Sequence, residues 1–287
     1  MEEQPRPSPH ALSVLFLLLM TSEPTHPSPG HYPSYRPPSR RQAPRFATMA
    51  HKAAAAEAFR DGADVYDEIR PEYPRLIGHL APGKTAVDIG AGTGKLTLSL
   101  PHDTVLACDP SPDMVRVLQA HGIKCWRATA ERLSLADSCV DAAFCAQAWH
   151  WVDAKAACQE LDRVVRADGS VVLVWNTIDV HSDPWVLRLT RIMHSGDILR
   201  PDFTPEVHSP WTIAEEHHEH WNQTLRVEQL HTLMHSRSYW LRATEKNRSR
   251  MTGNLNWYLF EHMGFQPGQK IEIPYRTDAF VLSRYAG

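Results

Sequence analysis

Short apolar runs alternate with amphipathic stretches through the middle of the chain, and this alternation predicts strands separated by helices. Apolar runs predict five successive strands, which begin near residues 85, 104, 123, 140 and 170. The clearest helix between them is expected at 154–166, where apolar residues recur at helical spacing. Two helices are also expected between Ala50 and Leu80, the second at 72–80, and another directly after the glycines that follow the first strand. Because so many strand–helix units require crossover connections, we expect an α/β fold with a doubly wound, Rossmann-like and mostly parallel sheet that carries helices on both faces.

The last third of the chain breaks this rhythm, and we expect a helical insertion before the sixth strand. Residues 178–225 form this predicted insertion on the substrate side, since variable elements above a rigid sheet usually select the substrate. The other predicted elements are helices at 185–193, 213–221 and 243–263 and strands at 226–234 and 271–284. Pro274 indicates an edge or bulged position for the last strand, because proline cannot donate to a sheet ladder. A seven-stranded sheet is the expected count.

Residues 1–48 differ in composition from the rest of the chain. They are crowded with proline and have no amphipathic period, which predicts a disordered, Pro-rich leader ahead of one domain at 49–287. The apolar run 11–20 is too short to span a bilayer and follows acidic residues instead of the basic start of a signal peptide. Met49 offers an alternative start to the chain.

Charge and cysteine content narrow the classes of function. The 287-residue chain has a formal net charge of -3, so it has no global positive field for nucleic acid or for an anionic membrane, and we expect neither as a partner. Its five cysteines are odd in number and form no C-x-x-C pair, which favours reduced thiols and a cytoplasmic location. The histidine cluster at 215–220 matches no metal-binding spacing, so we expect no metal.

A glycine turn follows the first strand and predicts a cofactor cradle. Asp88 ends the strand, and Gly90, Gly92 and Gly94 follow at alternate positions, where backbone turns tightly or approaches a ligand. A dinucleotide fingerprint would need a third small residue at Lys95, so the spacing disfavours a dehydrogenase. A plain strand-to-helix turn in another α/β protein stays open at this point.

Asp109 ends the second strand, about twenty positions beyond the glycines. An α/β nucleotide site places a carboxylate at this interval to accept hydrogen bonds from the ribose hydroxyls. The alternative is a cap for the next helix, a role that Ser111 is also able to take. After the fourth strand, Gln147 and His150 lie where a doubly wound sheet keeps its active site. His150 is either a base or a buried, hydrogen-bonded residue.

Taken together, the motifs resemble the class I S-adenosylmethionine-dependent methyltransferases of the type 11 group. Within that group they are nearest to small-molecule enzymes of the trans-aconitate methyltransferase type. The motifs that carry the resemblance are Tyr66 with Arg70-Pro-Glu-Tyr-Pro74, Val87-Asp-Ile-Gly-Ala-Gly-Thr-Gly94, Asp109-Pro-Ser-Pro-Asp-Met114, Ala130-Glu131, Gln147-Ala-Trp-His-Trp151, Trp175-Asn176, Ser236-Arg-Ser-Tyr239 and Pro274-Tyr-Arg-Thr277. Ala128 departs from the glycine that the family often has before its Ala-Glu turn.

The resemblance implies S-adenosyl-L-methionine as the cofactor and assigns residues to its parts. The methionine part would be cradled by Asp88, Gly90, Ala91 and Gly92, the ribose held by Asp109, the adenine flanked by Met114, Ala130 and Glu131, the methyl side lined by Gln147, and the cofactor covered by Tyr66 and Arg70. The implied reaction is an in-line transfer of the methyl group to a small-molecule carboxylate, hydroxyl or amine, in which alignment and exclusion of water do most of the work.

His150 is the candidate base if the acceptor must lose a proton, and it would position the acceptor if that is a carboxylate. Tyr66, Tyr239 and Tyr275 are the alternative bases. The place after strand four reads Gln-Ala-Trp-His and lacks the Asp/Asn-Pro-Pro-Tyr motif of enzymes that methylate nucleic-acid bases, which disfavours that activity. A degenerate methyltransferase fold that only binds the cofactor, or acts as an interaction module, stays open. A monomer and a homodimer are equally compatible with the sequence.

Overall fold

The computed structural model describes residues 69–194 and 202–285, and these all belong to one compact unit, Arg40–Gly287. The statements below refer to these residues. The predictions for the Pro-rich leader 1–48, the helix expected after Ala50 and the side chain of Tyr66 lie outside the described residues. Within the described part, no helix is both long and apolar enough to cross a membrane.

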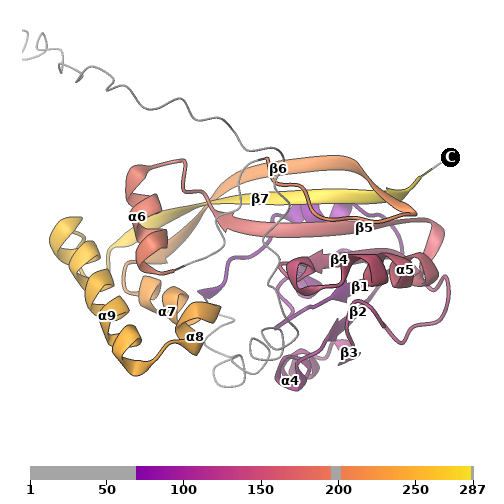
Figure 1. Ribbon diagram of the computed structural model, residues 1–287, viewed down its shortest axis with the longest axis horizontal. Coiled ribbons are helices and arrows are strands. Elements are labelled where there is room, and N and C mark those ends of the chain that lie inside the picture. Colours follow the sequence, from indigo (N-terminus) through magenta and orange to yellow (C-terminus); the bar gives the residue numbers. More distant parts are fainter. Residues whose placement is uncertain (1–68, 195–201, 286–287) are drawn as a thin grey trace, which may run out of the picture. The chain divides into compact units, whose positions relative to one another are not determined.

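A single seven-stranded sheet forms the centre of the described part, in the order β3-β2-β1-β4-β5-β7-β6 (Figure 1). Its strands are β1 (Thr85–Ile89), β2 (Thr104–Asp109), β3 (Lys124–Arg127), β4 (Val140–Ala146), β5 (Val165–Ile178), β6 (Trp211–Arg226) and β7 (Lys270–Arg284). Strands β1 to β5 pair in parallel, and β7 lies antiparallel between β5 and β6. The predicted seven-stranded, mostly parallel, Rossmann-like sheet is therefore confirmed.

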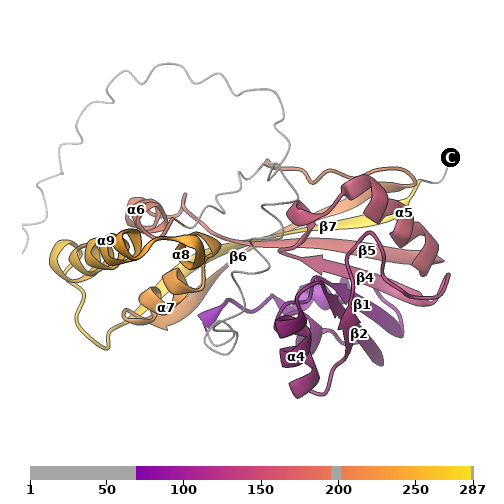
Figure 2. The same ribbon diagram turned by 60° about the horizontal axis from the view of Figure 1, so that its bottom comes forward.

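Helices accompany the sheet, and α6 to α9 gather where β6 ends and β7 begins (Figures 1 and 2). The α-helices are α4 (Pro112–Ala120), α5 (Ala154–Val164), α6 (Pro184–Ile192), α7 (Gln229–His235), α8 (Ser238–Arg242) and α9 (Glu245–Asn256). Shorter 3-10 turns are η1 (Arg75–His79), η2 (Thr97–Ser99) and η3 (Trp149–Trp151), and the π-helical turn η4 (Trp257–His262) extends α9. The helices predicted at 154–166, 185–193 and 243–263 are confirmed with small shifts of their ends.

Two elements of the last third were predicted in the wrong class. The segment 213–221 is not a helix but the middle of β6, which is polar on both faces because it is the outermost strand. The segment 226–234 is not a strand but mainly α7, in which Leu230, Leu233 and Met234 are buried at helical spacing. Since β6 starts at Trp211, the range 178–225 contains α6 and almost all of a sheet strand; its role on the substrate side stays a prediction.

Pro274 does not mark an edge strand, because β7 pairs on both sides. The residue lies just past the last pair with β5, Ile178 with Tyr275. Its carbonyl accepts a hydrogen bond from the amide of Asp179 at 2.8 Å, which shows that its backbone polar groups face the β5 side. The missing N–H would point to the same side, where β5 has ended, so no ladder bond to β6 is lost.

Two predicted helices are shorter than the sequence suggests. The glycine turn leads only into the three-residue turn η2, because Pro101 holds Leu100 in an extended conformation and stops the helix. The helix expected at 72–80 shrinks to η1. The amides that follow β1 are therefore arranged by the glycine turn and not by a long helix.

The buried side chains form apolar clusters that hold the sheet and the helices together. One cluster joins β1, β4 and β5 to α5 on one face, and a second fills the other face of the same strands. A third packs α6, α7 and α9 against the end of β6 and the start of β7.

The five cysteines are free thiols, and burial raises the pKa of Cys108 to about 12. A thiol of this kind stays protonated and packs as an apolar side chain.

Candidate functional site

A cavity of about 840 Å³ opens at the carboxyl ends of β1, β2, β4 and β5. This is the edge at which open α/β sheets bind ligands. Of the residues that the sequence assigned to the cofactor, ten line it: Arg70, Asp88, Gly90, Ala91, Gly92, Asp109, Met114, Ala130, Glu131 and Gln147. Segments that lie up to about 75 residues apart in the sequence thus meet at one place.

Gly90 and Gly92 both have left-handed backbone conformations, with φ of 68° and 56°. A Cβ on Gly90 would lie 2.5 Å from the Cβ of Ala148, so this glycine is required by close packing. A Cβ on Gly92 would meet no described atom within 4 Å. Since Gly92 lines the cavity, this open space is where a ligand is able to approach the backbone.

Asp88 is a buried carboxylate on the cavity wall, with only 1% of its surface exposed. The hydroxyl of Thr97 donates to its Oδ2 at 2.7 Å. Its Oδ1 is buried and accepts no hydrogen bond within the described residues. Burial, opposed by the Thr97 hydrogen bond, raises the pKa of Asp88 to about 7. A cationic ligand group in the cavity would favour the ionised form of Asp88.

Asp109 ties the glycine turn to the end of β2. Its Oδ2 accepts from the amide of Gly92 at 3.0 Å, and its Oδ1 accepts from the amide of Ser111 at 2.8 Å. Ser111 occupies the cap position of α4 without a side-chain hydrogen bond to the helix. Burial raises the pKa of Asp109, although both amide bonds lower it. A carboxylate oxygen accepts more than one hydrogen bond, so these contacts leave acceptor sites for ribose hydroxyls.

Gln147 and Asn176 form the wall between the ends of β4 and β5. Gln147 has a left-handed φ of 55°, and its amide nitrogen Nε2 donates a short hydrogen bond to the carbonyl of Asn176. Asn176 donates from Nδ2 to the carbonyl of Glu72 at 3.0 Å and accepts from the Thr277 hydroxyl at 2.6 Å. A strained non-glycine conformation held by such a network is typical of functional sites.

Residues 69–74, which we call the strap, contribute Arg70, Pro71 and Tyr73 to the cavity wall. The strap is fastened to three separate parts of the chain. Arg70 donates to the carbonyl of Ser236 at 2.7 Å, Gln223 of β6 donates to the carbonyl of Ile69 at 3.2 Å, and the third bond comes from Asn176. Arg70 therefore lies on the cavity wall, and its covering role stays a prediction.

Another part of the cavity wall contains Met114, Ala130, Glu131 and Trp151. Glu131 accepts from the amide of Asp153 at 2.8 Å, which fixes the turn after β3 against the start of α5. Ala128, the departure from the family pattern, also lies on this wall. The wall is mostly apolar and is suited to a flat aromatic ring.

His150 does not line the cavity, although Ala148 and Trp151 on either side of it do. Its ring instead lies against that of Trp151, with centroids 5.1 Å apart. The alternative bases Tyr239 and Tyr275 are also absent from the described cavity wall. The structure therefore gives no geometric support to a base at any of these positions, and the role of His150 stays a prediction.

Several wall residues were not assigned to the site from the sequence. Among them are Lys95, Cys145 and Asn176. Asn176 ends the apolar part of β5 just as Asp88 ends β1, so the rule that ligands bind at strand ends was sufficient to find it. Trp151, which the sequence places at the active-site end of the fourth strand, and Tyr73, which it places with Arg70 near the cofactor, both line the wall.

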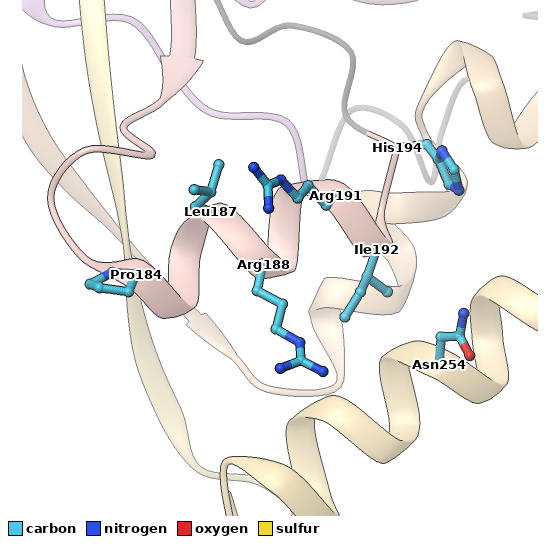
Figure 3. Close-up of a pocket in the computed structure, with 7 residues that line it drawn as sticks. All are labelled: Pro184, Leu187, Arg188, Arg191, Ile192, His194 and Asn254. Atoms are coloured by element: carbon cyan, nitrogen blue, oxygen red, sulfur yellow. The ribbon is translucent and has the colours of Figure 1, made fainter. Parts of the chain in front are cut away.

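A second, shallower cavity of about 480 Å³ lies over α6 (Figure 3). Its wall includes Arg188, Arg191, His194 and Asn254. The guanidinium groups of Arg188 and Arg191 extend from the helix to opposite sides, so they do not converge on one ligand (Figure 3). Arg188 instead lies 5.4 Å from the ring centroids of both Trp257 and Tyr258. We assign no function to this hollow.

Comparison with known proteins gives the same result for family and fold. A family model described as a methyltransferase domain matches residues 87–173. An uncharacterised methyltransferase of Mycobacterium tuberculosis is 36% identical over 229 residues, which cover 77% of this chain and 93% of that protein. A malonyl-[acyl-carrier protein] O-methyltransferase of Herminiimonas arsenicoxydans is 30% identical over 125 residues, covering 40% and 48%. A solved structure assigned as a type II methyltransferase of Anaeromyxobacter dehalogenans matches with a TM-score of 0.52 at 24% identity, covering 75% and 97%.

Proposed function

This chain belongs to the class I S-adenosylmethionine-dependent methyltransferases, and we propose that it methylates a small-molecule acceptor that presents a carboxylate, a hydroxyl or an amine. The family uses S-adenosylmethionine as its cofactor. One observation carries the proposal: a cavity of about 840 Å³ brings the glycine turn and two buried carboxylates to the carboxyl edge of the sheet. Small-molecule sites usually enclose about 300 to 1,000 Å³, so this volume suits a cofactor together with a small acceptor.

The polar groups at the β1 end of the cavity fit the methionine part of the cofactor. Asp88 lies on the cavity wall, and the positive charge of an ammonium group nearby would offset the cost of burying the carboxylate. The open space at Gly92 allows the backbone to approach the ligand. Arg70 on the strap is suited to the carboxylate of the same moiety, because a guanidinium binds carboxylates through paired donors.

The remaining walls fit the nucleoside and the methyl side. Asp109 would accept the ribose hydroxyls, and its bonds to the amides of Gly92 and Ser111 hold it in place for this role. Met114, Ala130 and Glu131 would flank the adenine. Gln147, fixed by its hydrogen bond to Asn176, would line the methyl side. Tyr66, which the family resemblance places over the cofactor, lies outside the described residues.

When bound, the cofactor supplies a sulfonium methyl group that is transferred by in-line displacement. The chain itself aligns the acceptor and keeps water out, which accounts for most of the rate acceleration in a reaction of this kind. The strap supplies the cover, since its three hydrogen bonds hold Tyr73 and Arg70 on the cavity wall. A carboxylate acceptor requires no base, which agrees with the position of His150 away from the wall. One relative is by name an O-methyltransferase of malonyl-[acyl-carrier protein], so carboxylates are the first acceptors to test.

Isothermal titration with S-adenosylhomocysteine tests the cofactor site. We expect micromolar binding, no binding of NADH, and for Asp109→Ala a loss of about 1 to 3 kcal/mol, since charge-assisted hydrogen bonds to the ribose disappear. Asp113→Ala is the matched control, because this nearby carboxylate at the start of α4 does not line the cavity. Equal affinities of the two variants would remove Asp109 from the site.

A second assay addresses the acceptor. The full chain is incubated with S-adenosylmethionine and, in separate reactions, a dicarboxylic acid, its thioester, a phenol and a primary amine, and the formation of S-adenosylhomocysteine is measured. Turnover that depends on one acceptor class and is lost in Asp109→Ala supports the proposal. Tight cofactor binding without turnover on any of these classes would contradict the small-molecule acceptor while leaving the family intact.

A further inference from the structure

β6 is an edge strand without a strand partner on its outer side in the part of the chain that the structure describes. It extends over 16 residues, and within the sheet it pairs only with β7. Figures 1 and 2 show it at the margin of the sheet. Because a strand carries hydrogen-bonding groups on both sides, the outer side of β6 presents a row of N–H and C=O groups that suits another strand.

Proteins usually protect such an edge, and in β6 this protection is limited to three glutamates and one bulge near its start. Edge strands are commonly short, or they carry proline and lysine that discourage pairing. β6 is long and contains neither residue between Trp211 and Arg226. One register shift lies near its start, between Ile213 and Glu215, which leaves the stretch from Glu215 onward regular. The middle of the strand therefore remains open to a partner.

A second copy of the chain is restricted to a few registers. In an antiparallel pair, the side chains of two opposite residues point to the same face of the sheet, whereas successive side chains of one strand alternate between the faces. A two-fold axis between two copies of β6 must therefore pass through a residue that lies opposite its own copy, and not between two residues. An axis at His217 would place Glu216 opposite His218, but also Glu215 opposite Glu219. An axis at Glu219 would place this glutamate opposite its own copy. Both registers set glutamates against one another, which is unfavourable.

An axis at His218 gives complementary pairs on both faces of the sheet. It places Glu216 of one copy opposite His220 of the other, and His217 opposite Glu219. His218 lies opposite its own copy, and Nδ1 of each ring bonds to Oδ1 of Asp278 at 2.7 Å. Two-fold symmetry repeats each pair, so four Glu–His pairs surround the axis. His220 suits this role, because its Nδ1 bonds to Oδ2 of Asp179 at 2.9 Å while its side chain stays 64% exposed. Its second ring nitrogen is thus available to a glutamate across the interface.

We propose that two copies of this chain pair antiparallel through their β6 strands, centred on His218, and join their sheets into one. The free backbone edge supplies the pairing, and the Glu–His pattern selects both the partner and the register. This homodimer does not depend on the proposed methyl transfer, and it is decided by separate measurements. It also resolves the choice between monomer and dimer that the sequence leaves open.

Disulfide cross-linking of the full chain tests the register. In the proposed dimer the two copies of residue 218 are about 4.5 to 5.5 Å apart between Cα atoms, so His218→Cys should form a covalent dimer under mild oxidation. Glu216→Cys alone and His220→Cys alone should not, because their own copies lie about 13 Å apart along the strand. An equal mixture of these two variants should cross-link. Wild-type protein measures the background from the native cysteines, and a thermal melt verifies that each variant is folded.

Sedimentation equilibrium at about pH 6.5, where imidazoles ordinarily carry part of a positive charge, tests the charge pattern. His220→Glu should weaken the dimer about tenfold, because it sets two pairs of glutamates opposite each other. Combining it with Glu216→His exchanges the charges and should restore most of the affinity. A wild-type monomer at high micromolar concentration overturns the proposal. A dimer with equal cross-linking of all three single cysteine variants, or one indifferent to His220→Glu, places the interface elsewhere and also overturns it.

Discussion

The buried carboxyl of Asp88 should make the protein less stable as the pH rises. Burial raises its pKa from 3.8 to about 7. Because the folded state then holds the proton more tightly than the unfolded state, folding is favoured while the carboxyl is protonated, and this contribution is lost as the pH rises from about 4 to 7. Relative to low pH, where the carboxyl is protonated in both states, the raised pKa lowers the free energy of unfolding by about 4 kcal/mol at pH 8 and by about 2 kcal/mol at pH 5.

Asp88→Asn tests this reasoning, since asparagine does not ionise and still offers an oxygen to the Thr97 hydroxyl. Its buried NH₂ group adds a penalty of its own, about 1 to 3 kcal/mol, but that penalty is the same at every pH. The informative quantity is therefore the change with pH. Relative to wild type, the variant should gain about 2 to 3 kcal/mol in free energy of unfolding between pH 5 and pH 8, measured by urea denaturation. A difference that stays constant over this range would refute the raised pKa.

Cofactor affinity should show the opposite trend from stability. If Asp88 binds the ammonium group, only the ionised carboxylate is competent, and its fraction rises from about one tenth at pH 6 to about nine tenths at pH 8. The dissociation constant of S-adenosylhomocysteine should then fall about tenfold over this interval, and Asp88→Asn should bind weakly and without this dependence. Asp113→Asn serves as the control and should follow wild type. The same pH dependence in Asp88→Asn would show that another group controls binding.

Two further substitutions separate the walls of the cavity. Asn176→Ala should lower the free energy of unfolding by about 1 to 3 kcal/mol and raise the KM for the acceptor, because the strap loses its bond to β5. Thr177→Ala is the control, since Thr177 is the neighbour on the other face of β5, and it should leave KM unchanged. Equal effects of the two substitutions would contradict a specific role of Asn176. His150→Ala should change S-adenosylhomocysteine affinity less than about twofold, because the side chain is off the wall, and a larger loss by titration would place it in the site.

The parallel half of the fold could be predicted from the sequence because the apolar runs of β1, β4 and β5 are buried on both faces of the sheet. Such runs have one plausible conformation, and the polar residues that end them, such as Asp88, Asp109 and Gln147, must meet at one edge. The residues on the cofactor side of the site could therefore be predicted directly from the carboxyl ends of these strands. The glycine spacing then distinguished the type of ligand.

The same reasoning predicted the wrong elements at 213–221 and 226–234 in the antiparallel half, and the cause lies in the pattern of burial there. At the sheet edge β6 is solvated on both faces, so its residues 215–220 show no alternation and look like the polar face of a helix. Conversely, α7 is only seven residues long, too short to show a clear helical period, and was predicted as a strand. Pro274 was misplaced because its effect depends on where the neighbouring strand ends, which only the assembled sheet reveals.

Asn176 links the methyl side of the site to the cover. Its side chain donates to the carbonyl of Glu72, 104 positions away on the strap, and accepts from the Thr277 hydroxyl on β7, while its backbone carbonyl accepts from Gln147 at the end of β4. A buried amide that is satisfied on both sides costs free energy when either partner moves. Opening the strap therefore removes the Glu72 partner of the Asn176 side chain, whereas the backbone bond to Gln147 does not depend on it. The strap bond should for this reason hold the cover closed beside Gln147, and its loss should cost about 1 to 3 kcal/mol.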